Sequence, residues 1–300
     1  MTAQSRLWDF VNGLLLPALL LAGFSALIVQ QTGLPNVFAP AATVVGPQTV
    51  DVLPRPYSYR ASGDYLEAGV PVDAPPVEVA APAPLEIMKY EVTADDYDRC
   101  VDDGDCHPAE PRRKVTGSVP ATGVSFDDAQ AYAAWLSRMT GDTWRLPSVA
   151  EWVFAAGSQA VDPALEDETN GSNPADRWIA FYEKEAELGI GKTSAAPQPA
   201  GYFGENEFGL ADMAGTTWEW TTTCNGRVSL DNAGGELSYI EACGVRFLEG
   251  RHRTPMSTFI RDGRSGGCSV GAPPDNLGFR LVREPSWIDG ILRLLPRSGA

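Results

Sequence analysis

The spacing of apolar residues predicts a helix near the middle of the chain. In SFDDAQAYAAWLSRMTGD, apolar side chains recur every three or four residues from Tyr132 to Met139. Ser125 occupies the N-cap position with Asp128 in the capping box, and Gly141 provides a C-terminal stop. The sequence therefore predicts an amphipathic helix that begins after Ser125 and ends at Gly141.

A second, shorter helix is predicted in PSVAEWVFAAG. Ser148 and Glu151 form another capping box, Trp152 and Ala155 face inward, and Gly157 ends the segment. This helix is expected to lie centrally.

Strands are predicted on both sides of these helices. The segments YSYRASGDYLEAG (57–69) and PLEIMKYEVTADDY (84–97) read as strands that flank a loop. In NLGFRLVRE, Leu277, Phe279 and Leu281 alternate toward one face, as in a terminal strand. Because the stretch 159–201 shows no regular pattern, we expect an α+β fold with low regular secondary structure and long ordered loops.

The N-terminal segment VNGLLLPALLLAGFSALIV, Val11 to Val29, is almost wholly apolar. As a helix it would be roughly 28 Å long, close to the thickness of a bilayer core. We predict one transmembrane helix within residues 1–29, with the rest of the chain on the periplasmic side of the inner membrane. Secretion after signal cleavage near Ala41 is the alternative.

The remaining boundaries follow from composition. Residues 30–54 are rich in proline and lack periodicity, as in an extended tether. The globular domain is expected over 55–286, with a tail over 287–300. The formal charge of −16 argues against a nucleic-acid partner, because sequence-independent binding needs clustered Lys and Arg.

Cysteine spacing suits an oxidising compartment. Cys100 and Cys106 bracket a short loop containing Gly104, so a disulfide is sterically plausible; a reduced metal pair is the alternative, but it lacks further ligands nearby. Of the other three cysteines, Cys243 and Cys268 fit a second disulfide, although Cys224 could pair with either.

Five ordered segments resemble the formylglycine-generating enzyme (sulfatase-modifying factor) family. They are YEVTADDYDRCV (90–101), PATGVSFDDAQAYAAWLSRMTG (120–141), WRLPSVAEWVFAA (144–156), NEFGLADMAGTTWEW (206–220) and DNLGFRLVRE (275–284). The resemblance implies that family's fold, related to C-type lectins, with bound calcium.

We expect one structural calcium ion, as the resemblance implies, and no copper or iron, because the family's ligands for those metals are missing from this chain. Its ligands would be the side chains of Asp212 and Glu219 and the carbonyls of Gly215 and Thr217, hard oxygen donors that suit Ca²⁺. Trp218 and Trp220 would be core anchors around the glutamate. The alternative is that Glu219 pairs with a buried arginine such as Arg280. The family's second calcium site, aligned with Asp176, Arg177 and Lys192, looks damaged because a cation there repels a metal.

No catalytic residue is assigned, because the family's copper-binding cysteine pair is missing. Between Gly244 and Gly267 there is no cysteine, and two alignments place the pair on Arg251 and Met256 or on Pro255 and Ile260. Cu(I) requires such soft sulfur ligands. A related branch holds iron with three histidines, whereas this chain has His107 and His252 alone.

The loop around His252 is locally basic, with Arg251, Arg253, Arg261 and Arg264. It is either a solvated loop whose arginines hold neighbouring carboxylates, or a surface that recognises an anion or acidic peptide. The binding candidates are Arg251, His252, Arg261 and Arg264.

These features favour a periplasmic binding or maturation accessory over an active oxidase. Among the family's branches the chain looks most like NirV, which is associated with copper nitrite reductase, and the PvdO-like proteins stay open. Two alternatives remain: an oxidoreductase with a non-standard site that modifies a protein substrate, and a calcium-dependent lectin-like recognition module.

Overall fold

A computed structural model describes most of the globular part of the chain. The described residues are 46–80, 82–111, 113–114, 116–160, 179, 196–213, 215–231, 235–263 and 276–284. The chain divides into a first unit, Met1–Ala42, and a second unit, Thr43–Ala300. The first unit, with the expected membrane helix, lies outside the described residues, as do Arg264, Cys268, the second calcium site and the tail over 287–300. Among the described residues, no helix is long and apolar enough to cross a membrane.

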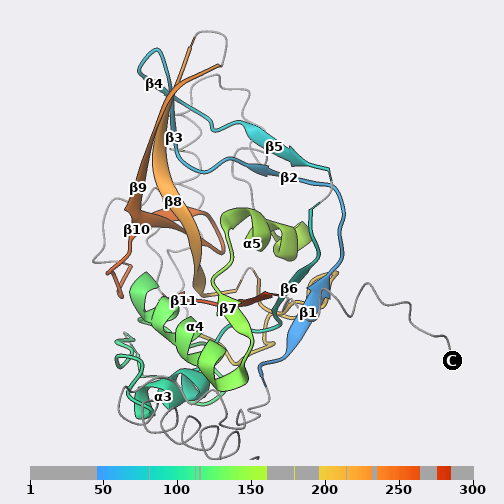
Figure 1. Ribbon diagram of the computed structural model, residues 1–300, viewed down its shortest axis with the longest axis vertical. Helices are drawn as coiled ribbons and strands as arrows, with labels where there is room; N and C mark the ends of the chain where they lie inside the picture. The colour runs from blue at the N-terminus through green and yellow to red at the C-terminus, as the bar shows by residue number, and fades with distance from the viewer. Residues whose placement is uncertain are drawn as a thin grey trace, which may run out of the picture. The chain divides into compact units, whose positions relative to one another are not determined.

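Short elements dominate the second unit (Figure 1). Its described helices are α3 (Ala94–Asp102), α4 (Phe126–Thr140), α5 (Val149–Ala156) and the 3-10 turn η2 (Gly157–Gln159). Its described strands are β1 (Thr49–Val52), β2 (Tyr57–Arg60), β3 (Asp64–Glu67), β4 (Val70–Val72), β5 (Pro76–Val79), β6 (Leu85–Met88), β7 (Thr143–Arg145), β8 (Trp218–Leu230), β9 (Glu236–Glu249), β10 (Thr254–Ser257), β11 (Leu277–Gly278) and β12 (Val282–Glu284).

The strands form three sheets in the described part of the chain. A four-stranded sheet has the order β1-β6-β12-β7, and a two-stranded sheet pairs β2 with β5. A six-stranded sheet has the order β10-β9-β8-β3-β4, and β11 also pairs with β8. Strands from both ends of the described sequence therefore lie side by side, as β1, β6 and β12 do, and the mixed α+β prediction is confirmed.

The two predicted helices are present with the predicted caps. The Ser125 hydroxyl accepts from the Asp128 amide, the Asp128 carboxylate accepts from the Ser125 amide, and Gly141 ends α4 with a left-handed φ of 78°. Ser148 and Glu151 form the same reciprocal box at the start of α5. These caps satisfy amides that a helix N-terminus otherwise leaves unpaired.

The expected strand over 84–97 is correct only in its first half. Residues Leu85–Met88 form β6, but Ala94–Asp102 form helix α3, for which Thr93 is the N-cap. The Thr93 hydroxyl accepts from the Asp96 amide, so the sequence TADD is a helix start rather than a strand end. The terminal strand is likewise divided into β11 and β12, with Leu277, Phe279 and Leu281 all buried between the helices and the sheets.

Two apolar clusters fill the interior of this unit. The larger one joins the inner face of α4 to β8 and to the final strands. Within it the ring of Tyr97 stacks on Tyr132, and Phe279 lies edge-on to Tyr132. The smaller one packs Trp152 and Phe154 of α5 against β1, β6 and β12. Both clusters contain side chains of the segment that ends in the W-E-W sequence of β8.

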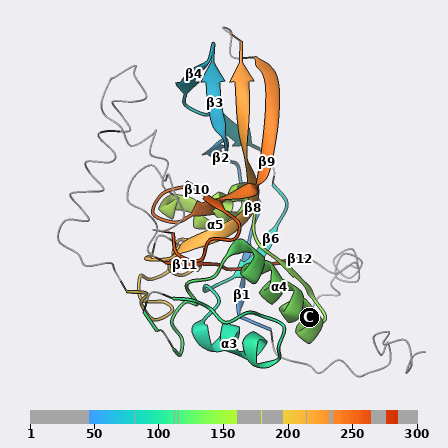
Figure 2. The same ribbon diagram turned by 90° about the vertical axis from the view of Figure 1, so that its left-hand side faces the viewer.

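The long strands β8 and β9 were not predicted from the sequence. They run antiparallel, with irregular register around Trp220, Cys224 and Asn225. Their lower parts are buried in the core, whereas their upper parts extend past the helices beside β3 and β4 (Figure 2). We call the upper parts, residues 225–230 of β8 and 236–244 of β9, the β-arm.

Candidate functional site

The W-E-W segment places a charged residue at the centre of the core. Trp218 and Trp220 are buried, as predicted, and the Trp220 indole donates to the Val124 carbonyl at 2.8 Å. Glu219 lies between them and is also buried. Its carboxylate needs compensation, because a lone buried charge is costly.

Arg280 supplies that compensation. Its Nε donates to Glu219 Oε2 at 2.7 Å and its Nη2 donates to Oε1 at 2.8 Å, in a bidentate pair. The Trp152 indole adds a third bond, to Oε2, at 3.1 Å. The remaining donor capacity of Arg280 goes to the carbonyls of Lys89 and Ala211, both at 3.0 Å. The pair of Glu219 with Arg280, one of the two sequence-based alternatives, is thus present.

A second buried carboxylate, Glu91, faces the same guanidinium. Its Oε2 lies 3.7 Å from Arg280 Nη2 and has no hydrogen-bond partner among the described residues. Burial raises the pKa of Glu91 to about 8, against the opposing charge of Arg280, and the charge of Glu219 adds to the rise. Glu91 is therefore mostly protonated at neutral pH. Glu91 was not among the predicted site residues, because no sequence pattern marks a buried glutamate.

Asp212 is held by backbone amides of the loop before it. Its carboxylate accepts from the Gly201 amide and, at 2.8 Å, from the Phe203 amide. The residue itself has a left-handed φ of 60°, which aspartate tolerates better than most residues. Asp212 thus fixes the turn that leads into β8.

The proposed calcium ligands do not form an open set of oxygens. Both carboxylate oxygens of Asp212 accept from amides, and both of Glu219 accept from Arg280. The Thr217 carbonyl packs against Gly250, where an added Cβ would approach within 3.0 Å, and Gly215 lies in the turn after Asp212. As placed, these residues do not fit a calcium site, because a guanidinium already occupies the position of the cation at Glu219. Calcium binding stays a prediction.

The basic loop is mostly neutralised by neighbouring carboxylates. Arg261 donates to both oxygens of Asp128, at 2.7 and 2.8 Å, and also to Glu110. Arg253 donates to Glu249. Burial acts to raise the pKa of Asp128, but hydrogen bonds from Arg261 and Ser125 outweigh it, so the pKa lies below its usual value. These contacts match the interpretation in which the arginines hold carboxylates.

The other binding candidates are not gathered into one surface. His252 is buried, with its ring edge-on to Trp218 at 5.4 Å between centroids, whereas Arg251 is exposed. Burial, with a smaller effect of the Arg251 charge, lowers the pKa of His252 to about 4. His252 is thus a neutral ring in the core at physiological pH, and Arg264 lies outside the described residues.

A pocket of about 570 Å³ opens beside Arg261. We call it the Arg261 pocket. Acidic side chains outnumber basic ones in its wall, and Phe259 is 72% exposed at its rim. Its lining residues are His107, Glu110, Ser125, Asp127, Asp128, Phe259, Ile260, Arg261 and Asp262.

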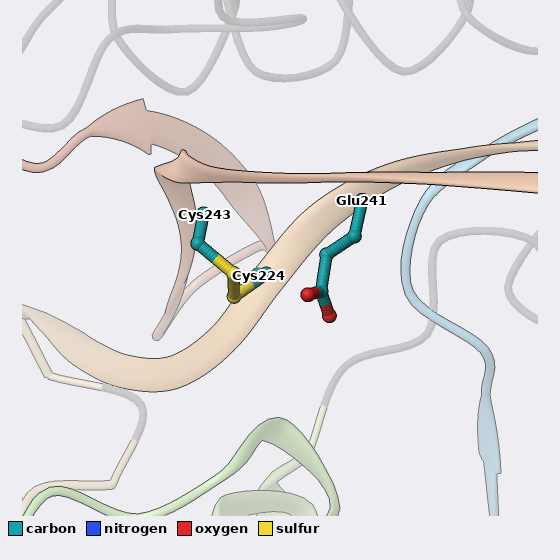
Figure 3. Close-up of side chains that lie close together, drawn as sticks. All are labelled: Cys224, Glu241 and Cys243. Carbon is teal, nitrogen blue, oxygen red and sulfur yellow. A yellow bond between two sulfur atoms is a disulfide. The ribbon is translucent and has the colours of Figure 1, made fainter.

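The described cysteines are joined in two disulfides. Cys100 pairs with Cys106, as predicted, and Cys224 pairs with Cys243. The expected pairing of Cys243 with Cys268 is wrong, because the register of β8 and β9 brings Cys224 and Cys243 to a Cα separation of 4.5 Å. Figure 3 shows Glu241 beside this second disulfide; the three side chains would form a metal-ligand group only if the sulfurs were reduced.

The positions aligned with the copper-binding cysteines have no sulfur ligand pair. Met256 is buried in the larger core cluster and Arg251 is exposed. In the other alignment, Pro255 lies in β10 and Ile260 lines the Arg261 pocket. Neither alignment places two thiolates near each other.

Comparison with known proteins shows which family and which proteins this chain is similar to. The family described as FGE-sulfatase, sulfatase-modifying factor enzyme 1-like domain, matches residues 35–285. The chain is 40% identical over 109 residues to a formylglycine-generating enzyme of Mycobacterium tuberculosis, covering 35% of this chain and 33% of the relative. It is 29% identical over 171 residues to the inactive C-alpha-formylglycine-generating enzyme 2 of Mus musculus, covering 55% and 49%.

Hercynine oxygenase of Mycolicibacterium smegmatis is 30% identical over 112 residues, covering 37% of this chain and 23% of the relative. The matched segments thus span between a quarter and a half of these relatives' own lengths. Among solved structures, PvdO from Pseudomonas aeruginosa aligns with a TM-score of 0.49 and 23% identity, over 82% of this chain and 99% of PvdO.

Proposed function

The chain belongs to the sulfatase-modifying factor enzyme 1-like domain family, and we propose that it is a member without the copper oxidase centre. We further infer that it binds a protein partner as an accessory or maturation factor. The observation that carries this proposal is the replacement of both aligned cysteine positions. A buried methionine at position 256 and an exposed arginine at position 251 supply no thiolate. Since Cu(I) in this chemistry needs two soft ligands, oxygen activation by that route has no centre here.

The Arg261 pocket supports a binding role. Its wall has a net negative charge, because it carries four carboxylates and one guanidinium, Arg261, which already binds Asp128 and Glu110. The other two carboxylates are those of Asp127 and Asp262. Such a wall suits a positively charged side chain rather than the acidic peptide considered from the sequence. The exposed ring of Phe259 offers an apolar and cation–π contact to the stem and head of a lysine or arginine.

We further propose that the protein acts on the periplasmic side of the inner membrane, tethered through its N-terminal segment, with copper nitrite reductase as a candidate client in the manner of NirV. The apolar run from Val11 to Val29 and the disulfide pairs support an exported chain. Membrane fractionation with protease accessibility in spheroplasts tests this placement. Release of the intact domain into the soluble periplasm would favour signal cleavage instead.

The decisive experiment for the absence of oxidase activity is anaerobic loading with Cu(I), followed by metal analysis and by oxygen uptake with a cysteine-containing peptide. We expect bound copper well below one per chain and no peptide-dependent oxygen uptake. Stoichiometric copper together with turnover would overturn the proposal and restore the oxidoreductase alternative.

The binding role is tested by calorimetry with short peptides that contain one central lysine or one central glutamate. We expect the lysine peptide to bind and Asp127→Asn to weaken it several-fold, since one of the wall charges is lost. Asp51→Asn, an exposed aspartate on β1 outside the pocket, is the matched control. Calcium-dependent binding in a glycan array, with no peptide binding, would favour the lectin-like alternative.

A further inference from the structure

The upper part of β9 is an exposed strand along its whole length. Every residue from Glu236 to Gly244 is exposed, whereas the last residues of β9 are buried. Strand β10 pairs with β9 only from Val245 to Leu248. Among the described strands, therefore, none pairs with the outer edge of the β-arm from Glu236 to Cys243.

The opposite edge of the same sheet is protected. It is formed by β4, which is only three residues long and carries Pro71 at its centre. Short strands and proline are devices by which proteins prevent an edge from pairing with another chain. The β9 edge has neither device: ELSYIEACG, residues 236–244, contains no proline, lysine or arginine.

Large apolar side chains line this unprotected edge. Leu237 is 69% exposed, Ile240 is 66% exposed and Tyr239 is 49% exposed. Along a strand, Leu237 and Tyr239 share one face and Ile240 lies on the other, so an added strand would cover apolar surface on both faces. This combination is typical of sites that bind a partner by strand addition.

We propose that the β9 edge from Glu236 to Cys243 binds an extended, positively charged segment of another protein as an additional β-strand. The positive charge follows from the edge itself, because residues 236–243 carry the carboxylates of Glu236 and Glu241 and no lysine or arginine. On the neighbouring β8, Arg227 is the one cation that pairs opposite this stretch. Opposite charges on facing strands stabilise pairing, and like charges oppose it. A second copy of this chain is a poor occupant, since it would bring the same acidic edge and a further net charge of −16.

The Cys224–Cys243 disulfide holds this edge in place. It joins β8 to β9 at the irregular register at the base of the β-arm, with Glu241 alongside (Figure 3). A strand that is fixed at its base loses less conformational entropy on binding than a free loop does. The binding site is therefore pre-organised by a covalent link inside the sheet.

The test uses the full-length protein with its disulfides intact and a short capped peptide of alternating valine and lysine. Hydrogen exchange should slow at the amides of residues 236–243 when the peptide binds. Ile240→Lys should weaken binding by about tenfold or more, because it removes apolar surface and adds a like charge. Val70→Lys is the matched control, since Val70 is 61% exposed on β4 of the same sheet and receives the same charge change.

Two further probes separate strand addition from general attraction to an acidic protein. The same peptide N-methylated at every residue keeps its charge but cannot donate backbone hydrogen bonds, so we expect it to give no exchange protection at residues 236–243. Asp127→Asn in the Arg261 pocket should leave binding at the β-arm unchanged. Because Asp127→Asn should weaken peptide binding only at the pocket, it distinguishes a loss of binding at the β-arm from a loss of binding at the pocket.

Several results would overturn the proposal. One is an equal loss of peptide affinity in Ile240→Lys and Val70→Lys. The others are undiminished exchange protection by the N-methylated peptide, or no protection of residues 236–243 by the unmodified peptide. A concentration-dependent dimer in sedimentation velocity that Ile240→Lys abolishes would assign the edge to a second copy of the chain instead.

Discussion

Glu91 should make the protein less stable as pH rises, and Glu91→Gln should remove this dependence. The pKa of Glu91 is raised from 4.5 to about 8 in the folded protein, chiefly by burial. Between these two values the folded state keeps a proton that the unfolded chain has lost. Because the folded state then binds more protons, the free energy of unfolding falls as pH rises through this window. The contribution of Glu91 is complete below the unfolded pKa and is lost toward pH 8.

The size of the effect follows from the width of that window. One pKa unit corresponds to about 1.4 kcal/mol, so a rise from 4.5 to about 8 sets an upper bound of about 5 kcal/mol. The Arg280 guanidinium faces Glu91 as well as Glu219, and its charge opposes the rise in the pKa of Glu91. We therefore expect Glu91→Gln to gain about 2–5 kcal/mol over wild type between pH 5 and pH 8.

The assay is urea denaturation of the disulfide-bonded protein at several pH values, followed by tryptophan fluorescence and circular dichroism. Wild type and Glu91→Gln should have similar pH dependence below pH 4.5 and should diverge above it, in favour of the variant. Glu78→Gln, at an exposed position of β5, controls for the loss of one negative charge. A constant difference between Glu91→Gln and wild type from pH 5 to pH 8 would refute the assignment of a protonated Glu91.

Three other predictions follow from the same contacts. Arg280→Met should cost about 3–5 kcal/mol in urea denaturation, because it leaves the Glu219 carboxylate buried with Trp152 as its remaining donor; a loss below 1 kcal/mol would show that the pair is not buried in solution. Limited treatment with a dithiol, read by differential alkylation and mass spectrometry, should label the exposed Cys243 well before the buried Cys100; equal labelling would contradict the difference in burial. Removal of calcium with a chelator should leave the melting temperature unchanged, because Arg280 already balances Glu219; a fall reversed by added calcium would support the calcium prediction.

The helices were predictable because their signals are local. Ser125 and Asp128, like Ser148 and Glu151, meet across one turn, so the sequence alone specifies the contact. Helix α3 was missed although Thr93 is its N-cap, because TADD lies shortly after the apolar strand β6 and was read as its continuation. Local chemistry thus located two helices and misplaced the boundary of a third.

Contacts between distant residues were less accessible to sequence reasoning. The pairing of Glu219 with Arg280 was named only as an alternative, since spacing along the chain does not show which buried cation meets which carboxylate. The disulfide partner of Cys243 depends on the register between β8 and β9. The TTTCNGRVSL part of β8 has too few apolar residues to reveal a strand. Three cysteines outside the first loop left more than one pairing open.

The arrangement of charge links the core to the two proposed binding surfaces. In the core, one guanidinium, Arg280, faces the two buried carboxylates of Glu219 and Glu91, and protonation of Glu91 removes the excess charge. At the surface no such remedy is needed, because water stabilises the exposed carboxylates of the Arg261 pocket and of the β9 edge, which are those of Glu110, Asp127, Glu236 and Glu241. The buried Asp128 is instead paired with Arg261. These exposed carboxylates can therefore stay ionised and attract a cationic partner, so salt should weaken binding at both surfaces.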